Sequence, residues 1–130
     1  MAHILVVEDE PLISALTQDW LSELGHVVVG PAADLASALK LAATPIDAAI
    51  IDVSLGRHSG YPVAEALAAR AVPFVFATGH GVDGIDAAWR GRPTLVKPFD
   101  FEAFRRAVEG VLGGGRSDPA ATSSRNSLWR

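Results

Sequence analysis

The stretch 47–60, D-A-A-I-I-D-V-S-L-G-R-H-S-G, places a short apolar run directly before a carboxylate. The run 48–51 contains β-branched residues and is followed by Ser, Gly and His, which predicts a strand buried on both faces. In an open parallel sheet, ligands bind outside the carboxyl ends of the strands. We therefore expect Asp52, which ends this run, to face a site. A solvated Asp at a strand end is the alternative, and the chemistry of the other strand ends decides against it.

The rest of the chain alternates between predicted strands and predicted helices. Apolar runs of strand type, bounded by turn residues or proline, lie at 3–7, 26–30, 46–52, 72–78 and 93–97. Helical spacing of apolar residues predicts helices from about Glu10 to Leu24, from Asp34 to Ala42, from Tyr61 to about Arg70, and from Asp100 to Leu112. This pattern predicts a (βα)5 α/β fold, a doubly wound parallel five-stranded sheet with the flavodoxin-like order 2-1-3-4-5.

The first predicted helix begins at a proline and ends before a glycine. Pro11 is favoured at a first helical position, and Gly25 stands where a left-handed cap is expected. Apolar residues at helical spacing predict the face that the helix buries, and these are Ile13, Leu16, Trp20 and Leu24.

Length, composition and charge narrow the function classes. A chain of 130 residues with 49% hydrophobic residues fits one domain with a real core. Its formal charge of -4 offers no basic field for nucleic acid, and the absence of cysteine excludes disulfides and thiolate chemistry. The first apolar run, Ile4 to Val7, is too short for a signal sequence or a membrane span. We expect a cytoplasmic protein that binds neither nucleic acid nor membrane.

Polar side chains follow four of the predicted strands at the edge where the strands end. With the order 2-1-3-4-5, this edge collects three carboxylates, a hydroxyl and an ammonium from Glu8, Asp9, Asp52, Thr78 and Lys97. Such hard oxygen ligands suit Mg²⁺, which in proteins uses a few carboxylates together with waters and a phosphate. Asp52 is then a nucleophile for a phosphoryl group, and Thr78 and Lys97 are placed to donate to the phosphoryl oxygens.

These residues resemble the receiver domain of two-component response regulators across residues 1–113. The resemblance is carried by L-V-V-E-D-E at 5–10, I-I-D-V-S-L-G at 50–56, Gly60, F-A-T-G at 76–79 and L-V-K-P-F at 95–99. It implies that Glu8 and Asp9 form the acidic metal pair, that Asp52 is phosphoacceptor and metal ligand, and that the Ser54 backbone carbonyl is a further ligand. It also implies that Thr78 senses the phosphoryl group and that Lys97, ahead of a usually cis bond to Pro98, pairs with it.

Two departures from the usual receiver pattern bear on signalling. Receivers usually carry Tyr or Phe three residues before the lysine, and this chain has Thr94 there. The stretch P-F-V-F-A-T-G at 73–79 resembles the F-A-T-G subgroup, commonly single-domain proteins associated with histidine kinases of the HWE or related type. The resemblance thus implies such a kinase as partner and an unidentified downstream protein. His80 occupies the place of a residue that tunes access of water to the phosphoryl group.

Three function hypotheses follow from different classes. The first is a single-domain phosphoacceptor module that is not an enzyme acting on other substrates and that signals through protein contacts. The second is a haloacid-dehalogenase-like phosphatase, but that family needs a second Asp where this chain has Ser54. The third is a pseudo-receiver, which the complete acidic and lysine set argues against. A G-x-G-x-x-G match at 79–84 follows the fourth strand rather than the first, so we interpret it as a chance match.

Two segments lack the signals of stable structure. The segment 79–89 carries three glycines, each costing ~1 kcal/mol relative to alanine in a helix, so a fourth helix there should be short or frayed. Residues 114–130 show neither the helical nor the strand period of apolar residues and contain few apolar residues. This predicts a flexible C-terminal tail.

Overall fold

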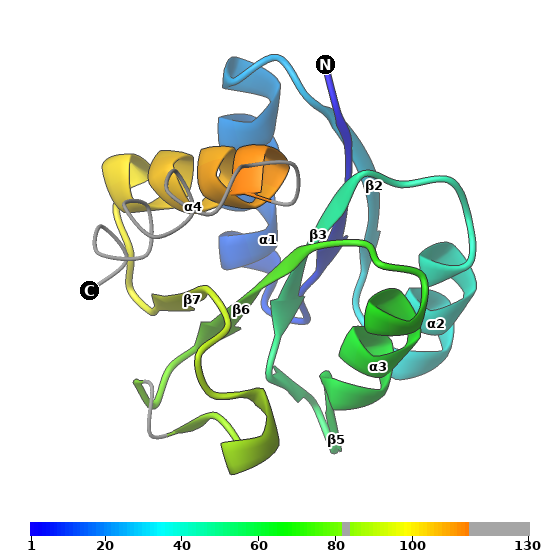
Figure 1. Ribbon diagram of the computed structural model, residues 1–130. Coiled ribbons are helices and arrows are strands. Elements are labelled where there is room, and N and C mark those ends of the chain that lie inside the picture. Colours follow the sequence, from blue (N-terminus) through cyan, green and yellow to red (C-terminus); the bar gives the residue numbers. More distant parts are fainter. Residues whose placement is uncertain (82–83, 115–130) are drawn as a thin grey trace.

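A parallel five-stranded sheet forms the centre of the molecule (Figure 1). The computed structural model describes residues 1–81 and 84–114. The sheet order is β2-β1-β3-β6-β7, which is the predicted order 2-1-3-4-5. Its strands are β1 (His3–Val7), β2 (Val27–Ala32), β3 (Ala48–Asp52), β6 (Phe74–Thr78) and β7 (Thr94–Val96). The carboxyl ends of β1, β3, β6 and β7 therefore meet at one edge.

Helices cover both faces of this sheet, as the buried strands require. They are α1 (Pro11–Glu23), α2 (Leu35–Ala42), α3 (Tyr61–Ala69) and α4 (Phe101–Gly114). Figure 1 shows α2 and α3 together on one side of the sheet and α1 and α4 on the other. Strand β1 feeds both layers: Leu5 and Val7 belong to one hydrophobic cluster, and Ile4 and Val6 to the other.

The structure confirms three predicted residues at helix ends. Asp34 caps α2 by accepting a hydrogen bond from the Ser37 amide at 2.8 Å, and Asp100 accepts one from the Ala103 amide at 2.8 Å before α4. Gly25, just after α1, has a φ of 85°, the left-handed conformation for which glycine is favoured.

The buried face of α1 differs from the prediction. Its buried residues are Ser14, Thr17 and Leu21, whereas Leu16 is 41% exposed. Trp20 and Leu24 are only partly buried and pack at the margin of the core cluster. The buried line lies one residue after the predicted one because it includes the polar residues Ser14 and Thr17, which apolar spacing does not select.

Two connections could not be foreseen from strand or helix periods. The loop after β3 forms a small antiparallel hairpin of β4 (Ser54–Leu55) and β5 (His58–Ser59). Between β6 and β7, the described residues include a short 3-10 turn, Ala87–Trp89, and no α-helix. The expectation of a short or frayed fourth helix fits this observation. The predicted tail, 114–130, lies outside the described residues except for Gly114, which ends α4.

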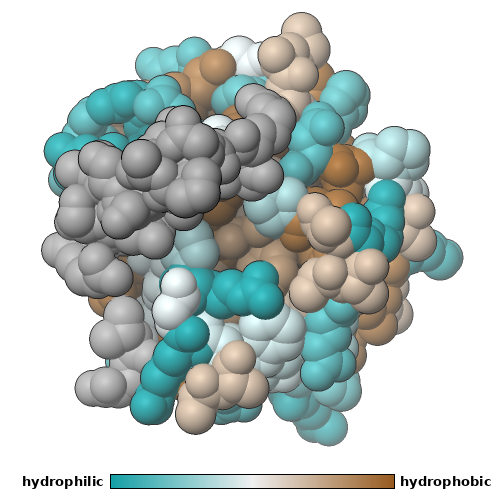
Figure 2. Space-filling model, in the orientation of Figure 1, coloured by the Kyte–Doolittle hydropathy of each residue, from teal (hydrophilic) through white to brown (hydrophobic). Residues whose placement is uncertain are grey.

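Large hydrophobic side chains that stay exposed come from separate elements rather than from one. They include Leu12 and Leu16 on α1, Leu39 on α2 and Val96 on β7. On the face drawn in Figure 2, hydrophobic surface is visible between hydrophilic residues. Within 1–81 and 84–114, no helix has the length and hydropathy needed to cross a membrane.

Candidate functional site

Four strands end at the edge of the sheet where the predicted residues meet. Glu8 follows β1 directly, Asp52 ends β3, Thr78 ends β6 and Lys97 follows β7. A cleft of about 210 Å³ opens here. It is lined by Asp9, Glu10, Asp52, Ser54, Gly56, Gly79, His80 and Lys97. Residues as far apart in the chain as Asp9 and Lys97 therefore share one small polar cleft.

Asp52 is held in one orientation by two donors. It is only 3% exposed. Its Oδ1 accepts a hydrogen bond from the Ser54 amide at 3.0 Å, and its Oδ2 lies 3.1 Å from Lys97 Nζ. Gly60 packs directly behind it, because a Cβ at that position would lie 2.2 Å from the Asp52 carbonyl oxygen. The Asp52 carboxylate thus lines the cleft, and Gly60 packs against the backbone of the same residue.

Lys97 bridges the buried carboxylates. Its Nζ lies 3.0 Å from Glu8 Oε1 and 3.1 Å from Asp52 Oδ2, with Glu10 Oε1 farther away at 3.5 Å. Burial alone would lower the pKa of this ammonium, but its hydrogen bond to Glu8 and the charges of Asp52 and Glu8 outweigh burial and raise the pKa. Lys97 therefore stays charged. Its own amide donates to the Thr78 carbonyl at 2.8 Å, and the Lys97–Pro98 peptide is cis.

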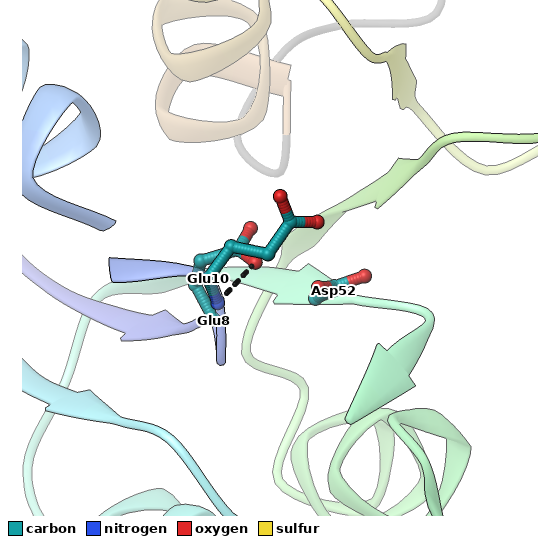
Figure 3. Close-up of side chains that lie close together, drawn as sticks. All are labelled: Glu8, Glu10 and Asp52. Atoms are coloured by element: carbon teal, nitrogen blue, oxygen red, sulfur yellow. Dashed lines mark hydrogen bonds between the residues drawn. The ribbon is translucent and has the colours of Figure 1, made fainter. Parts of the chain in front are cut away.

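Glu8 is buried beside a second acid, and this changes its ionisation. Burial raises the pKa of Glu8 from 4.5 to about 7, and the neighbouring Asp52 acts in the same direction. The hydrogen bonds from Lys97 and from the Glu10 amide, the latter 3.1 Å from Glu8 Oε2, act in the opposite direction. Figure 3 shows the hydrogen bond between the Glu10 amide and Glu8, with Asp52 beside these two residues.

The carboxylates that gather most closely are Glu8, Glu10 and Asp52. Each offers one oxygen, and these oxygens lie within 4.8 Å of one another. This donor set fits a hard divalent cation such as Mg²⁺. Asp9 lines the same cleft, but its Oδ2 accepts a hydrogen bond from the Gly56 amide at 2.9 Å. Sequence reasoning did not single out Glu10, although the run E-D-E at 8–10 carries three acids in a row.

The remaining predicted residues lie at different distances from this cluster. Thr78 is buried at 2% exposure, and its Oγ1 accepts a hydrogen bond from the His80 amide at 3.0 Å. His80 is exposed at the wall of the cleft. Thr94 is not among the lining residues, and its hydroxyl donates to the Arg92 carbonyl at 3.0 Å.

The described residues between the G-x-G-x-x-G match and β7 contain no α-helix whose amino end could receive a pyrophosphate. Gly84 instead packs close to Thr78, as a Cβ there would lie 2.9 Å from Thr78 Oγ1. The interpretation of this match as a chance one agrees with the structure.

Residues 4–109 match the response regulator receiver domain family. The chain belongs to this family, and it is a receiver domain of the two-component type with an acidic cluster suited to Mg²⁺. Among curated proteins, it is 30% identical over 121 residues to the transcriptional activator protein IrlR of Burkholderia pseudomallei, covering 88% of this chain. It spans about half the length of the curated relatives it matches, 52% for IrlR.

Solved structures agree with this assignment. SdrG from Sphingomonas melonis Fr1 is 46% identical, with a TM-score of 0.77, and the match covers 86% of this chain and 97% of SdrG. The receiver domain of the sensor histidine kinase PA1611 from Pseudomonas aeruginosa PAO1 is 27% identical, with a TM-score of 0.74 and coverage of 86% and 98%. That structure carries a magnesium ion in its active site cleft.

Proposed function

We propose that this chain is a single-domain response regulator, 1–113, that accepts a phosphoryl group on Asp52 and signals through protein contacts. The observation that carries the proposal is the position of Asp52. It ends the central strand β3, it is oriented by Ser54 and Lys97, and it stands beside an acidic cluster at an open cleft. A nucleophilic carboxylate needs this combination of fixed orientation and access.

The reaction proceeds by attack of an Asp52 carboxylate oxygen on the phosphorus of a phosphohistidine. The new O–P bond forms as the P–N bond breaks, and the histidine imidazole of the donor leaves with the electron pair. The product is an acyl phosphate on Asp52. Lys97 already contacts Asp52 Oδ2, so its ammonium is positioned to hold a phosphoryl oxygen once that group arrives.

Bound Mg²⁺ would offset the negative charge that nucleophile and phosphate bring together. Glu8, Asp52 and the Ser54 carbonyl are the ligands we expect from this chain, with Asp9 in the acidic pair. Glu10 joins this set on the basis of its place within 4.8 Å of the Glu8 and Asp52 oxygens. These three carboxylates support the proposal because, among the described residues, the Lys97 ammonium is the one cation that contacts them.

Three further residues act around the phosphoryl group. Thr78 would donate its hydroxyl to a phosphoryl oxygen, since its Oγ1 accepts a hydrogen bond from the His80 amide and donates to none of the residues that the structure describes. His80, exposed at the wall of the cleft, would modulate the approach of water. Thr94 replaces the usual aromatic residue and would alter how the phosphorylated state is relayed.

The expected partners are a cytoplasmic histidine kinase domain of the HWE or a related type and a downstream protein. The kinase class rests on the F-A-T-G stretch at 76–79. The negative net charge supports protein partners rather than nucleic acid or an acidic membrane surface. We place the protein in the cytoplasm and assign it no catalysis beyond its own phosphorylation and dephosphorylation.

Incubation with acetyl phosphate and Mg²⁺, followed by intact-mass measurement, tests this proposal against its alternatives. One phosphate that persists on the wild type and is absent from Asp52→Asn supports the phosphoacceptor. Continuous release of phosphate would favour a phosphatase, and no reaction would favour a pseudo-receiver. Undiminished labelling of Asp52→Asn would show that the site is elsewhere. A phosphotransfer panel of HWE-type and other histidine kinases then tests the partner class.

A further inference from the structure

An aromatic cluster lies beside β6, on the side of the sheet that α3 covers. The Tyr61 ring at the start of α3 stacks on the Trp89 ring with centroids 6.2 Å apart and planes 3° apart. It also meets the Phe76 ring edge-on at 5.7 Å and 77°. Phe76 stands two residues before Thr78 in β6. Tyr61 therefore contacts both the strand that carries Thr78 and the turn that ends at Trp89.

The Tyr61 hydroxyl makes two polar contacts with the segment 84–89, which leads into this turn. It accepts a hydrogen bond from the Asp86 amide at 2.8 Å, and it donates to the Gly84 carbonyl at 3.4 Å. These bonds join residues 23 to 25 positions apart. The segment lacks an α-helical hydrogen-bond ladder, so contacts from outside contribute much of its order.

The other side of the segment touches the proposed phosphoryl sensor. Gly84 lies so close to Thr78 and His80 that a Cβ on it would be 2.9 Å from Thr78 Oγ1 and 2.7 Å from His80 Cβ. Gly84 is thus held between the Tyr61 hydroxyl and Thr78. Any movement of Thr78 toward the cleft changes the space into which Gly84 packs.

We propose that Tyr61 is the residue that couples Thr78 to the segment 84–89, taking the role that Thr94 lacks the ring to perform. The proposal rests on Asp52 being the phosphoacceptor. A phosphoryl group on Asp52 draws the Thr78 hydroxyl toward the cleft, and Gly84 moves into the space that the hydroxyl leaves. The hydrogen bonds and ring stacking of Tyr61 then restrict the motion of Asp86 and Trp89 as well. Tyr61 is a positioning residue here, as it touches neither Asp52 nor the phosphoryl group.

The position of Thr94 explains why another residue takes this role. The Thr94 hydroxyl donates a hydrogen bond to the carbonyl of Arg92, two residues before it in the chain. Tyr61, in contrast, reaches the segment 84–89 from α3. Trp89 further contacts the Phe74 and Phe76 rings, with Arg92 placed over both Phe74 and Trp89. The link from Tyr61 therefore ends on a residue that is packed against β6.

The variant Tyr61→Phe removes the hydroxyl and keeps the ring. In the free protein, the Asp86 amide should exchange about fivefold faster, because a typical hydrogen bond is worth about that factor. Thr94→Val, which removes a hydroxyl from the same connection, should leave Asp86 exchange unchanged. An unchanged Asp86 amide in Tyr61→Phe would overturn the proposal at its first step.

The coupling itself is tested with beryllofluoride and Mg²⁺, which mimic the phosphorylated state. We expect wild-type protein to gain amide protection across 84–89. Tyr61→Phe should still bind beryllofluoride, a few-fold more weakly, while its gain at Asp86 and Trp89 is lost. A full gain in Tyr61→Phe would overturn the coupling while leaving the phosphoacceptor intact. A wild type that neither binds beryllofluoride nor accepts phosphate on Asp52 would overturn the proposed function, and the coupling with it.

A second variant approaches the same contact from the other side. Gly84→Ala places a methyl group against Thr78 and His80 and should displace the segment from Thr78, while the Tyr61 side chain itself is kept. The beryllofluoride-induced gain at Asp86 and Trp89 should be lost in this variant too. A normal gain in Gly84→Ala would contradict the path from Thr78 through Gly84.

Discussion

Lys97 Nζ lies 3.1 Å from Asp52 Oδ2, at the point where β7 and β3 end on opposite sides of β6. The same ammonium contacts Glu8 at 3.0 Å. One cation therefore holds two buried acids together before any metal or phosphate arrives. This relation makes Lys97 a structural neighbour of the proposed metal ligands and also a ready donor to a phosphoryl group.

Removal of this ammonium separates its two roles. In Lys97→Ala, we expect phosphorylation of Asp52 to persist in part, because the lysine is not the nucleophile, and its conformational effect to weaken. Mg²⁺ affinity should not fall, because the ammonium competes with the metal for the same carboxylates. The metal-free protein should lose about 3 kcal/mol of stability, since two buried acids lose their counter-charge.

Mg²⁺ titration and denaturant unfolding in EDTA measure these two effects. Lys40→Ala is the matched control, because Lys40 is an exposed lysine on α2. Strongly weakened Mg²⁺ binding in Lys97→Ala alone would show that the ammonium serves the metal rather than the phosphoryl group.

The raised pKa of Glu8 predicts a pH dependence of the metal-free protein. In the folded state Glu8 keeps its proton up to about pH 7, whereas in the unfolded chain it loses the proton near pH 4.5. The folded state thus binds more protons than the unfolded state between these values, so stability from this group is present below pH 4.5 and is lost as pH rises through 7. The side chain in Glu8→Gln has no such proton.

Thermal unfolding in EDTA between pH 5 and 8 checks this expectation. The wild type should lose stability relative to Glu8→Gln as the pH rises. Parallel curves for the two proteins would contradict the raised pKa.

Gly60 predicts a steric requirement behind the phosphoacceptor. A Cβ there would lie 2.2 Å from the Asp52 carbonyl oxygen and 2.7 Å from Ile51 Cγ2. Because a backbone carbonyl in the central strand has little room to move, Gly60→Ala should destabilise the fold by about 2 kcal/mol. Denaturant unfolding measures this against Gly79→Ala, since a Cβ at Gly79 meets no atom within 4 Å. Equal stability of the two variants would remove the steric argument.

The sheet and the meeting of four polar residues at one edge were predictable because the strands are short apolar runs, and four of them end in or are followed by a polar residue. The parallel order then brings Glu8, Asp52, Thr78 and Lys97 to one edge. Other features depend on three-dimensional packing that no local period encodes. The buried line of α1 runs through Ser14 and Thr17, and apolar spacing favours their larger neighbours.

The contact of Glu10 with the cluster and the bonds of Tyr61 to the segment before β7 were also missed. Glu10 reaches the cluster through its side-chain conformation, which the sequence does not specify. Tyr61 meets Asp86 across 25 residues, and only the folded chain brings them together. Long-range polar contacts of single side chains leave no periodic signal.

Residues 79–89 lie where receivers usually place a fourth helix, and their amide exchange should report the state of the site. The described part of this segment holds no α-helix and few backbone hydrogen bonds, among them Trp89 N to the Asp86 carbonyl at 2.9 Å. Its amides should therefore exchange quickly in the free protein compared with those of β3 or β6.

Occupation of the site by phosphate, or by beryllofluoride with Mg²⁺, should slow exchange across this segment. The Thr78 hydroxyl would bind a phosphoryl oxygen, and the His80 amide, already 3.0 Å from Thr78 Oγ1, would be fixed with it. Helix α2, which contributes no residue to the cleft, is the internal reference and should exchange equally in both states. Equal protection of 79–89 with and without beryllofluoride, or a difference confined to another face, would rule out this segment as the switch.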